Sequence, residues 1–277
     1  MRLRSNPGRG SVSLLVAGIA WKFLLAALAS TALAQQQPQE LSLRSLPKRF
    51  VQDEAALWTS PFRQSASRGP FLKKYVLPFT ALTAVLIGSD RKIADSLPNT
   101  SHQTRWSGRI SQLGASYSLA GLSAGTYVFG ALGGNERARE TGLLALEALG
   151  HTEVGVFAIK QLTNRERPLQ ADGARRGFWN GGNSFPSGHA GGAFAVATVF
   201  ACEYRDHLAV PIAGYSIATA ISVSRVGARR HWASDIVAGG ALGIMIGRFT
   251  CGHRQGRSRL LPKVGLGPSG PALSWRL

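Results

Sequence analysis

The sequence has 277 residues, of which 44% are hydrophobic and only 17% charged, and glycine occurs 33 times. This length allows one sizeable domain with appendages, and this composition suits helices that pack closely through small residues in water or in lipid. The 32 Lys and Arg against 14 Asp and Glu give a net charge of +18, which favours anionic partners such as phosphorylated molecules or a membrane surface. Nucleic acid is excluded as the expected partner, because the basic residues are scattered or fall in short motifs without a recognisable nucleic-acid-binding module.

Residues 1–34 have the pattern of an export signal. An apolar run extends from Phe23 to Ala29, and the small residues Ala32 and Ala34 precede a polar glutamine run. The basic residues of the segment are Arg2, Arg4, Arg9 and Lys22. We predict a cleaved signal peptide, with an uncleaved N-terminal anchor as the alternative, because Lys22 interrupts the apolar stretch before it reaches the length of a membrane span.

Residues 35–74 are predicted to form an N-terminal helical arm that packs on the main body. Its helical part is Phe50 to Trp58, which ends before Ser60 and Pro61. Residues 75–250 form the predicted core, and residues 251–277 a basic tail. The core contains six apolar segments rich in Gly, Ala and Ser without the alternation of strands, which predicts helices and an all-α fold. The segments are Tyr75–Gly88, Leu113–Gly133, Thr141–Ile159, Ala190–Ala201, Leu208–Val223 and Ile236–Ile246.

Three short motifs fall at the junctions of these segments. They are Lys160-x6-Arg167-Pro168, Pro186-Ser187-Gly188-His189, and Ser224-Arg225-x5-His231-x3-Asp235. The first follows the third segment, the second opens the fourth, and the last joins the fifth to the sixth. Antiparallel neighbouring helices would therefore bring all three motifs to one end of a bundle.

The residue types in these motifs suit phosphoryl transfer. His231 is the predicted nucleophile, and Asp235, four residues later on one helix face, would fix its tautomer. His189 would protonate the leaving group and then activate water. Phosphate oxygens would be held by cations and by a helix N-terminus. The predicted phosphate-binding residues are Lys160, Arg167, Ser187, Gly188 and Arg225.

The three motifs together resemble the signature of the type 2 phosphatidic acid phosphatase superfamily (PAP2), which also includes bacterial acid phosphatases and vanadium haloperoxidases. The resemblance covers residues 75–250 and implies a six-helix core bundle with the active site at one end. No cofactor and no metal are expected, because the phosphate clamp consists of protein cations. Glu147 and His151, an i, i+4 pair, are interpreted as a buried hydrogen-bonded pair and not as metal ligands.

The sequence thus predicts a metal-independent phosphatase that hydrolyses a phosphomonoester or diphosphate, expected to be that of a lipid, through a phosphohistidine. The alternatives are a vanadium-dependent haloperoxidase and a noncatalytic lipid- or phosphate-binding membrane protein. For location, two arrangements stay open: an exported periplasmic body associated with the membrane, or an integral membrane protein with the site on the outer side. Several segments are short or interrupted by charge, which favours the first.

Cys202 and Cys251 are the only two cysteines. Both are predicted to lie towards the end of the bundle opposite the motifs, but at different heights. We therefore weigh a disulfide, which would require helix stagger or an early end to the last helix, against two separate buried thiols.

Overall fold

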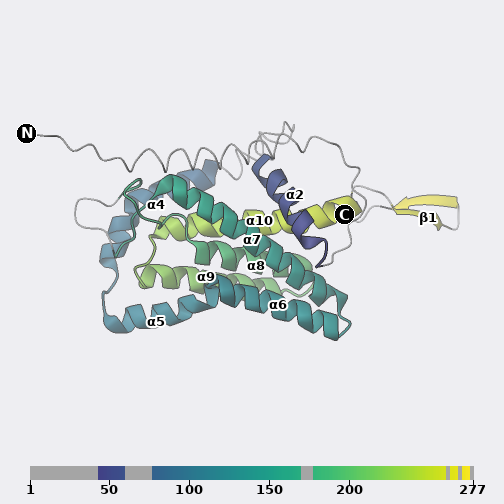
Figure 1. The fold of residues 1–277 in the computed structure, drawn as a ribbon, viewed down its shortest axis with the longest axis horizontal. Coiled ribbons are helices and arrows are strands. Elements are labelled where there is room, and N and C mark those ends of the chain that lie inside the picture. Colours follow the sequence, from purple (N-terminus) through teal and green to yellow (C-terminus); the bar gives the residue numbers. More distant parts are fainter. Residues whose placement is uncertain (1–42, 60–76, 170–176, 260–262, 268–269, 275–277) are drawn as a thin grey trace, which may run out of the picture.

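The structure is a computed structural model that describes residues 43–59, 77–169, 177–259, 263–267 and 270–274. The predicted export signal lies outside the described residues. Eight α-helices and one short antiparallel hairpin make up the regular structure of the described part, with a 3₁₀ turn between α5 and α6 (Figure 1). The helices are α2 (Leu46–Thr59), α4 (Leu77–Ser96), α5 (Ser101–Ser111), α6 (Ser116–Leu132), α7 (Glu136–Thr163), α8 (Gly188–Glu203), α9 (Ala209–Gly227) and α10 (Ala233–Arg259), and the strands are β1 (Lys263–Gly267) and β2 (Gly270–Ser274).

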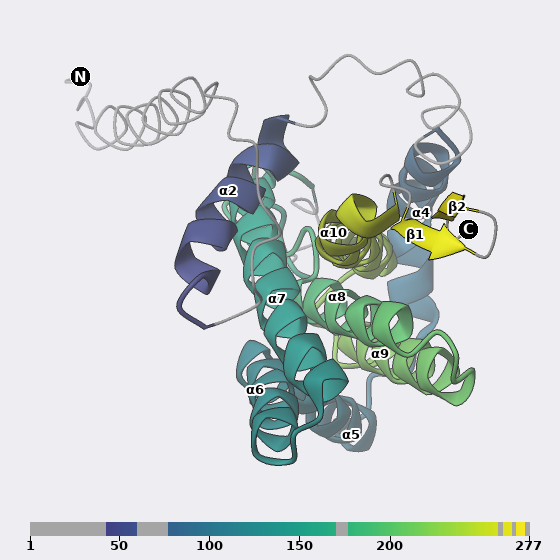
Figure 2. The ribbon, with the colours of Figure 1, turned by 90° about the vertical axis from the view of Figure 1, so that its right-hand side faces the viewer.

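Helix α8 lies at the centre of the bundle. It packs against α7, α9 and α10, while α6 covers α7, α5 contacts α9 and α4 contacts α10 (Figure 2). The buried core is formed largely by small and aliphatic side chains of α7 and α8, such as Ala145, Ala148, Ala195 and Val199. The all-α fold predicted from the sequence is confirmed, and each of the six predicted apolar segments overlaps one of the helices α4, α6, α7, α8, α9 and α10.

Glycine allows α8 and α10 to approach closely. A Cβ atom at Gly243 would lie 2.1 Å from the carbonyl oxygen of Gly191, and one at Gly239 would lie 2.3 Å from that of Ser187. No side chain fits at these distances, so the two backbones can meet only where glycine is present. This contact joins the start of α10 to the start of α8, where two of the three motifs lie.

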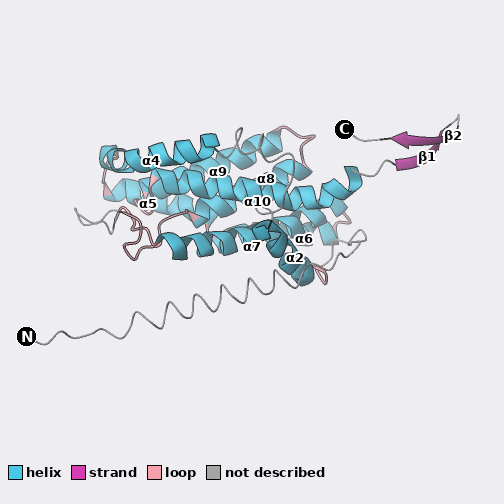
Figure 3. Cartoon of the chain, turned by 90° about the horizontal axis from the view of Figure 1, so that it is seen from above, coloured by secondary structure: helices cyan, strands magenta, loops and turns pink. Residues whose placement is uncertain are grey.

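Two helices extend the predicted six. Helix α2 includes the helical stretch expected at Phe50 to Trp58 and lies against α7. Helix α5 was not predicted; it is a polar helix whose N-cap, Thr100, accepts a hydrogen bond from the backbone N–H of Gln103. The predicted basic tail also contains the unpredicted strands β1 and β2, which lie beyond the end of α10 (Figure 3).

Cys202 and Cys251 are neighbouring free thiols. The two side chains lie close enough to interact, and no disulfide joins them. Of the two expectations, the structure agrees with two unbonded thiols, of which Cys251 is buried and Cys202 is partly exposed. Contact is possible because α8 ends at Glu203, immediately after Cys202, while Cys251 lies well before the end of α10.

Within the described residues, three helices combine the length and the apolar composition that a membrane crossing requires: α7, α9 and residues 233–252 of α10. Helix α9 is the most exposed of the three, because only 22% of its apolar stretch is buried inside the protein. Its exposed side chains include Ile212, Ile217 and Val223. Helix α8, with 16 residues, is enclosed by the other helices and is not among the three.

Candidate active site

The three motifs meet at one end of the bundle, as predicted. Lys160 lies in the last turn of α7, Ser187 is the N-cap of α8, and Arg225 lies in the last turn of α9. The backbone N–H of Ser187 donates to the backbone carbonyl of Asp235 at 3.0 Å, which ties the start of α8 to the start of α10.

His231 is buried immediately before α10, and its ring is held through Nδ1. The backbone carbonyl oxygen of Ser184 lies 2.8 Å from Nδ1, whereas Oδ2 of Asp235 lies 3.4 Å away. The principal acceptor is therefore this carbonyl and not the predicted carboxylate of Asp235. A carbonyl can only accept, so Nδ1 carries the proton and the lone pair resides on Nε2.

Burial also determines the charge of His231. It lowers the pKa of this imidazole to about 4, even though the nearby Asp235 acts in the opposite direction. The ring is thus neutral near pH 7, which is the state that a nucleophile requires.

Asp235 is engaged mainly by other groups. Its Oδ1 accepts a hydrogen bond from Nη1 of Arg165 at 2.6 Å. Its Oδ2 accepts from the Ser184 hydroxyl and from the backbone N–H of Trp232. Asp235 therefore holds His231 in place. It binds Trp232, the next residue after His231, and Ser184, whose carbonyl oxygen contacts the His231 ring.

Arg165 and Asp90 extend this buried network and were not predicted. Nη2 of Arg165 lies 2.7 Å from Oδ2 of Asp90, and Oδ1 of Asp90 accepts from the backbone N–H of Ser234 at 2.9 Å. Arg165 and Asp90 are each 3% exposed, so the guanidinium between two carboxylates compensates charges that would otherwise be costly to bury.

The three predicted cations lie around His189. Burial lowers the pKa of this imidazole to about 3, and after it electrostatic interactions with Arg225, His231, Lys160 and Arg167 act in the same direction. The groups of the three motifs therefore lie close enough to His189 to influence its charge. Such a concentration of positive charge favours an oxyanion.

Two of these cations are held by polar contacts from other segments of the chain. Nε of Arg167 donates to Oδ1 of Asn183 at 3.0 Å, and Nη1 of Arg225 donates to the hydroxyl of Ser111 at 3.1 Å. Ser111 is the last residue of α5, so this unpredicted helix supports the site.

Ser187 and Gly188 form the start of α8. The hydroxyl of Ser187 accepts a hydrogen bond from the backbone N–H of Ala190, as a helix cap does, and its own hydrogen is still able to donate. At Gly188 a Cβ atom would lie 3.5 Å from Val156. Packing within the protein therefore does not demand glycine there, and the predicted role in close approach of a phosphate stays a prediction.

Residues 141–258 match the PAP2 superfamily. This part of the chain belongs to the PAP2 superfamily. The match includes all three motifs and helices α8 and α9. The predicted family is thus confirmed.

One curated relative, described as lipid A 1-phosphatase from Porphyromonas gingivalis, is 40% identical over 110 residues. That match spans 39% of this chain and only 23% of the relative's length.

Two crystal structures are similar. One is the transmembrane PAP2-type phosphatidylglycerolphosphate phosphatase of Bacillus subtilis, with a TM-score of 0.52, 24% identity, and coverage of 65% of this chain and 94% of that one. The other is Aquifex aeolicus LpxE, with a TM-score of 0.48, 22% identity, and coverage of 59% and 93%. The first of these supports the PAP2 fold.

Proposed function

We propose that this PAP2 protein is a metal-independent phosphatase that removes phosphate from a lipid phosphomonoester or diphosphate through a phosphohistidine on His231. The observation that carries the proposal is the neutral, Nδ1-protonated imidazole of His231 at the same end of the bundle as three cations and a second histidine. This arrangement supplies a nucleophile, an oxyanion clamp and a proton carrier without further groups.

The reaction takes two displacements. In the first, the Nε2 lone pair of His231 forms a bond to phosphorus while the bond from phosphorus to the leaving oxygen breaks, and His189 gives its proton to that oxygen. In the second, the now neutral His189 takes a proton from water, the resulting hydroxide attacks phosphorus, and the phosphorus–nitrogen bond breaks. Phosphate leaves and both imidazoles return to their starting states.

The cations Lys160, Arg167 and Arg225 would hold the nonbridging oxygens throughout. Burial keeps His189 neutral before the substrate binds, and the charges of these cations act in the same direction. A bound phosphate supplies compensating negative charge, so the proton that the leaving group needs becomes stable on His189 only in the complex.

A lipid substrate is supported by two observations. The curated relative is described as a lipid A phosphatase, and three helices of the described part could cross a membrane. The apolar side chains on α9 would then face lipid, and the site at the bundle end would lie at the membrane surface. The export signal predicted over residues 1–34 favours the outer side.

A substrate panel tests the proposal. Purified protein in detergent is assayed with lipid phosphates and soluble phosphates, with and without EDTA, and in parallel for bromide oxidation with vanadate. We expect phosphate release that EDTA does not abolish and that orthovanadate inhibits competitively, because vanadate mimics the transition state in an all-protein clamp. Loss of activity in EDTA with recovery in Mg²⁺ would contradict metal independence. Bromide oxidation without phosphate release would instead indicate a haloperoxidase, and neither reaction a noncatalytic binding protein.

A further inference from the structure

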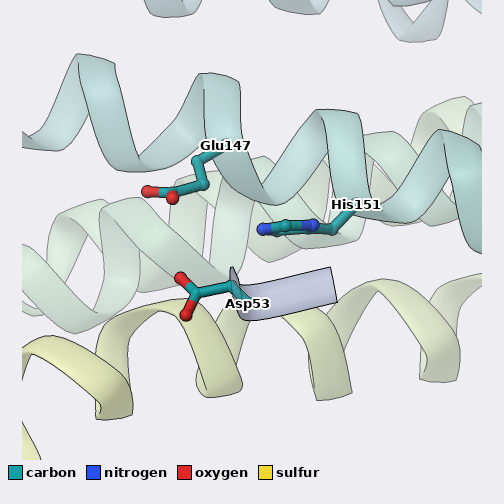
Figure 4. A group of neighbouring side chains, drawn as sticks. All are labelled: Asp53, Glu147 and His151. Carbon is teal, nitrogen blue, oxygen red and sulfur yellow. The ribbon is translucent and has the colours of Figure 1, made fainter. Parts of the chain in front are cut away.

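A second polar cluster lies away from the phosphatase motifs, between α2 and α7. It consists of Asp53 from α2 and of Glu147 and His151 from α7 (Figure 4). One ligand atom from each of the three side chains lies within 4.8 Å of the other two. The three side chains converge from two helices that are far apart in sequence, which is why the sequence alone indicated only the pair on α7.

His151 is oriented as a metal-binding histidine would be. Its side chain is fully buried, its ring stacks on Phe50 at a centroid distance of 4.2 Å, and its Nδ1 lies 3.0 Å from Oε1 of Glu54. The carboxylate of Glu54 accepts a hydrogen bond from the protonated Nδ1, so the lone pair is on Nε2. Among the described residues Nε2 has no hydrogen-bond partner, and a ring nitrogen faces the side where Glu147 and Asp53 lie (Figure 4).

Glu147 also presents a free acceptor. Arg49 from α2 pairs with Oε2, while Oε1 is buried and has no hydrogen-bond partner within the described part of the chain. Glu147 is 2% exposed. The interpretation of Glu147 and His151 as a pair bonded to each other is therefore not what the structure shows, because each side chain bonds to α2.

Negative charges outnumber positive charges in this cluster, which favours binding of a divalent cation. By formal charge, Asp53, Glu54 and Glu147 count as three negative charges and Arg49 as one positive charge, which sums to −2 with an uncharged imidazole. An excess of negative charge buried between α2 and α7 is costly, and α7 is one of the candidate membrane spans. A divalent cation bound by two carboxylates and one imidazole would cancel it.

We propose that Asp53, Glu147 and His151 bind a divalent transition metal ion, of which Zn²⁺ fits the ligand types well, and that this ion clamps α2 onto α7. Zinc takes imidazole and carboxylate ligands at about 2.0–2.2 Å, so its ligand atoms lie roughly 3.4 Å apart in a tetrahedron. Ligand atoms within 4.8 Å of one another reach that spacing by small side-chain movements. Glu54 would be the positioning residue that orients His151.

The metal site is separate from the phosphatase site. His151 precedes Lys160 by nine residues on α7, which is about 13 Å along the helix. The ion would therefore stabilise the attachment of the arm and take no part in phosphoryl transfer. Hydrolysis by folded protein would still proceed in EDTA, at temperatures below the unfolding transition of the metal-free form.

Zinc binding to the tag-free full chain in detergent tests the proposal. The protein is stripped with EDTA, desalted and titrated with Zn²⁺, while bound zinc is measured by mass spectrometry and stability by thermal unfolding. We expect one zinc per chain and a higher unfolding temperature. Glu54→Gln should weaken zinc affinity by roughly ten- to a hundred-fold, and Asp53→Asn should weaken it more.

Two control variants separate this site from others. Asp95→Asn removes an exposed acidic side chain on α4 and should bind zinc like the wild type. The double variant His189→Gln, His231→Gln should also retain the zinc, because its changes affect only the phosphatase site. Wild-type protein that binds no stoichiometric zinc, or Asp53→Asn that binds it as tightly as the wild type, would overturn the proposal.

Discussion

At the scale of single residues, His189 and His231 have different tasks that substrate chemistry can separate. His189→Gln should slow hydrolysis of an alkyl phosphate by roughly 10²–10⁴-fold, the usual contribution of general acid catalysis. It should slow the first step with an activated aryl phosphate much less, because an aryl oxide leaves without a proton. His231→Ala should abolish turnover of both substrates. Equal losses on the two substrates with His189→Gln would exclude His189 as the acid.

The charge of His189 gives a second prediction. Burial and the neighbouring cations lower its pKa to about 3 in the free protein, so it is neutral at pH 6. A bound oxyanion stabilises the imidazolium, and the pKa should therefore rise by at least about one unit, which corresponds to ~1.4 kcal/mol. NMR titration of labelled histidines with and without inorganic phosphate measures this shift. The exposed His207 is the internal control, and an unchanged His189 titration would count against an anion site beside it.

The sequence predicted the residues of the three motifs but not the buried residues that hold them in place. His231, Asp235 and the three cations lie in short patterns whose spacing can be read directly. In the sequence, Arg165 lies between Lys160 and Arg167 and resembles an ordinary exposed cation. In the structure it is buried between Asp90 and Asp235. These partners are 75 and 70 residues from it along the chain, so only the fold brings them together.

At the scale of elements, the close contact of α8 and α10 positions two of the motifs. Gly239→Ala would place a Cβ atom against the carbonyl oxygen of Ser187, and the helices must separate to accept it. We expect a loss of about 1–3 kcal/mol in unfolding free energy, as for other overpacked cores, together with lower phosphatase activity.

Gly125→Ala in α6 is the matched control, because nothing lies within 4 Å of its Cβ position. Alanine there should leave the protein equally stable or stabilise it by up to about 1 kcal/mol. Thermal unfolding and activity of the two variants test this contact. A Gly239→Ala protein with wild-type stability and activity would show that the helices need no glycine here.

The helices differ in how far the sequence could predict them. Helices α6, α8 and α9 begin and end within four residues of their predicted apolar segments, whereas α7 extends beyond its segment at both ends and α10 continues to Arg259, into the predicted tail. Helix α5 has few apolar residues, and two of them, Trp106 and Ile110, are exposed, so it shows no buried stripe in the sequence. It is held instead by contacts to α9, such as the hydrogen bond from the Gln103 side chain to the carbonyl of Gly227.

At the scale of the whole molecule, the outward apolar face of α9 predicts how the protein is held in the cell. A chain with α9 and α10 in the bilayer should stay in the membrane pellet after extraction at alkaline pH, because apolar surface and not charge would hold it there. A peripheral body held by its net charge of +18 would be released by this treatment or by high salt. Quantitative blotting of pellet and supernatant decides between the two arrangements.

The most direct test of the central claim is to trap the phosphohistidine. Protein mixed with a ³²P-labelled aryl phosphate is quenched in base, where phosphohistidine survives, and the label is located by peptide mapping. We expect label on His231, a larger amount in His189→Gln because the water of the second step is no longer activated, and none in His231→Ala. Label on another residue, or full turnover by His231→Ala, would contradict the account.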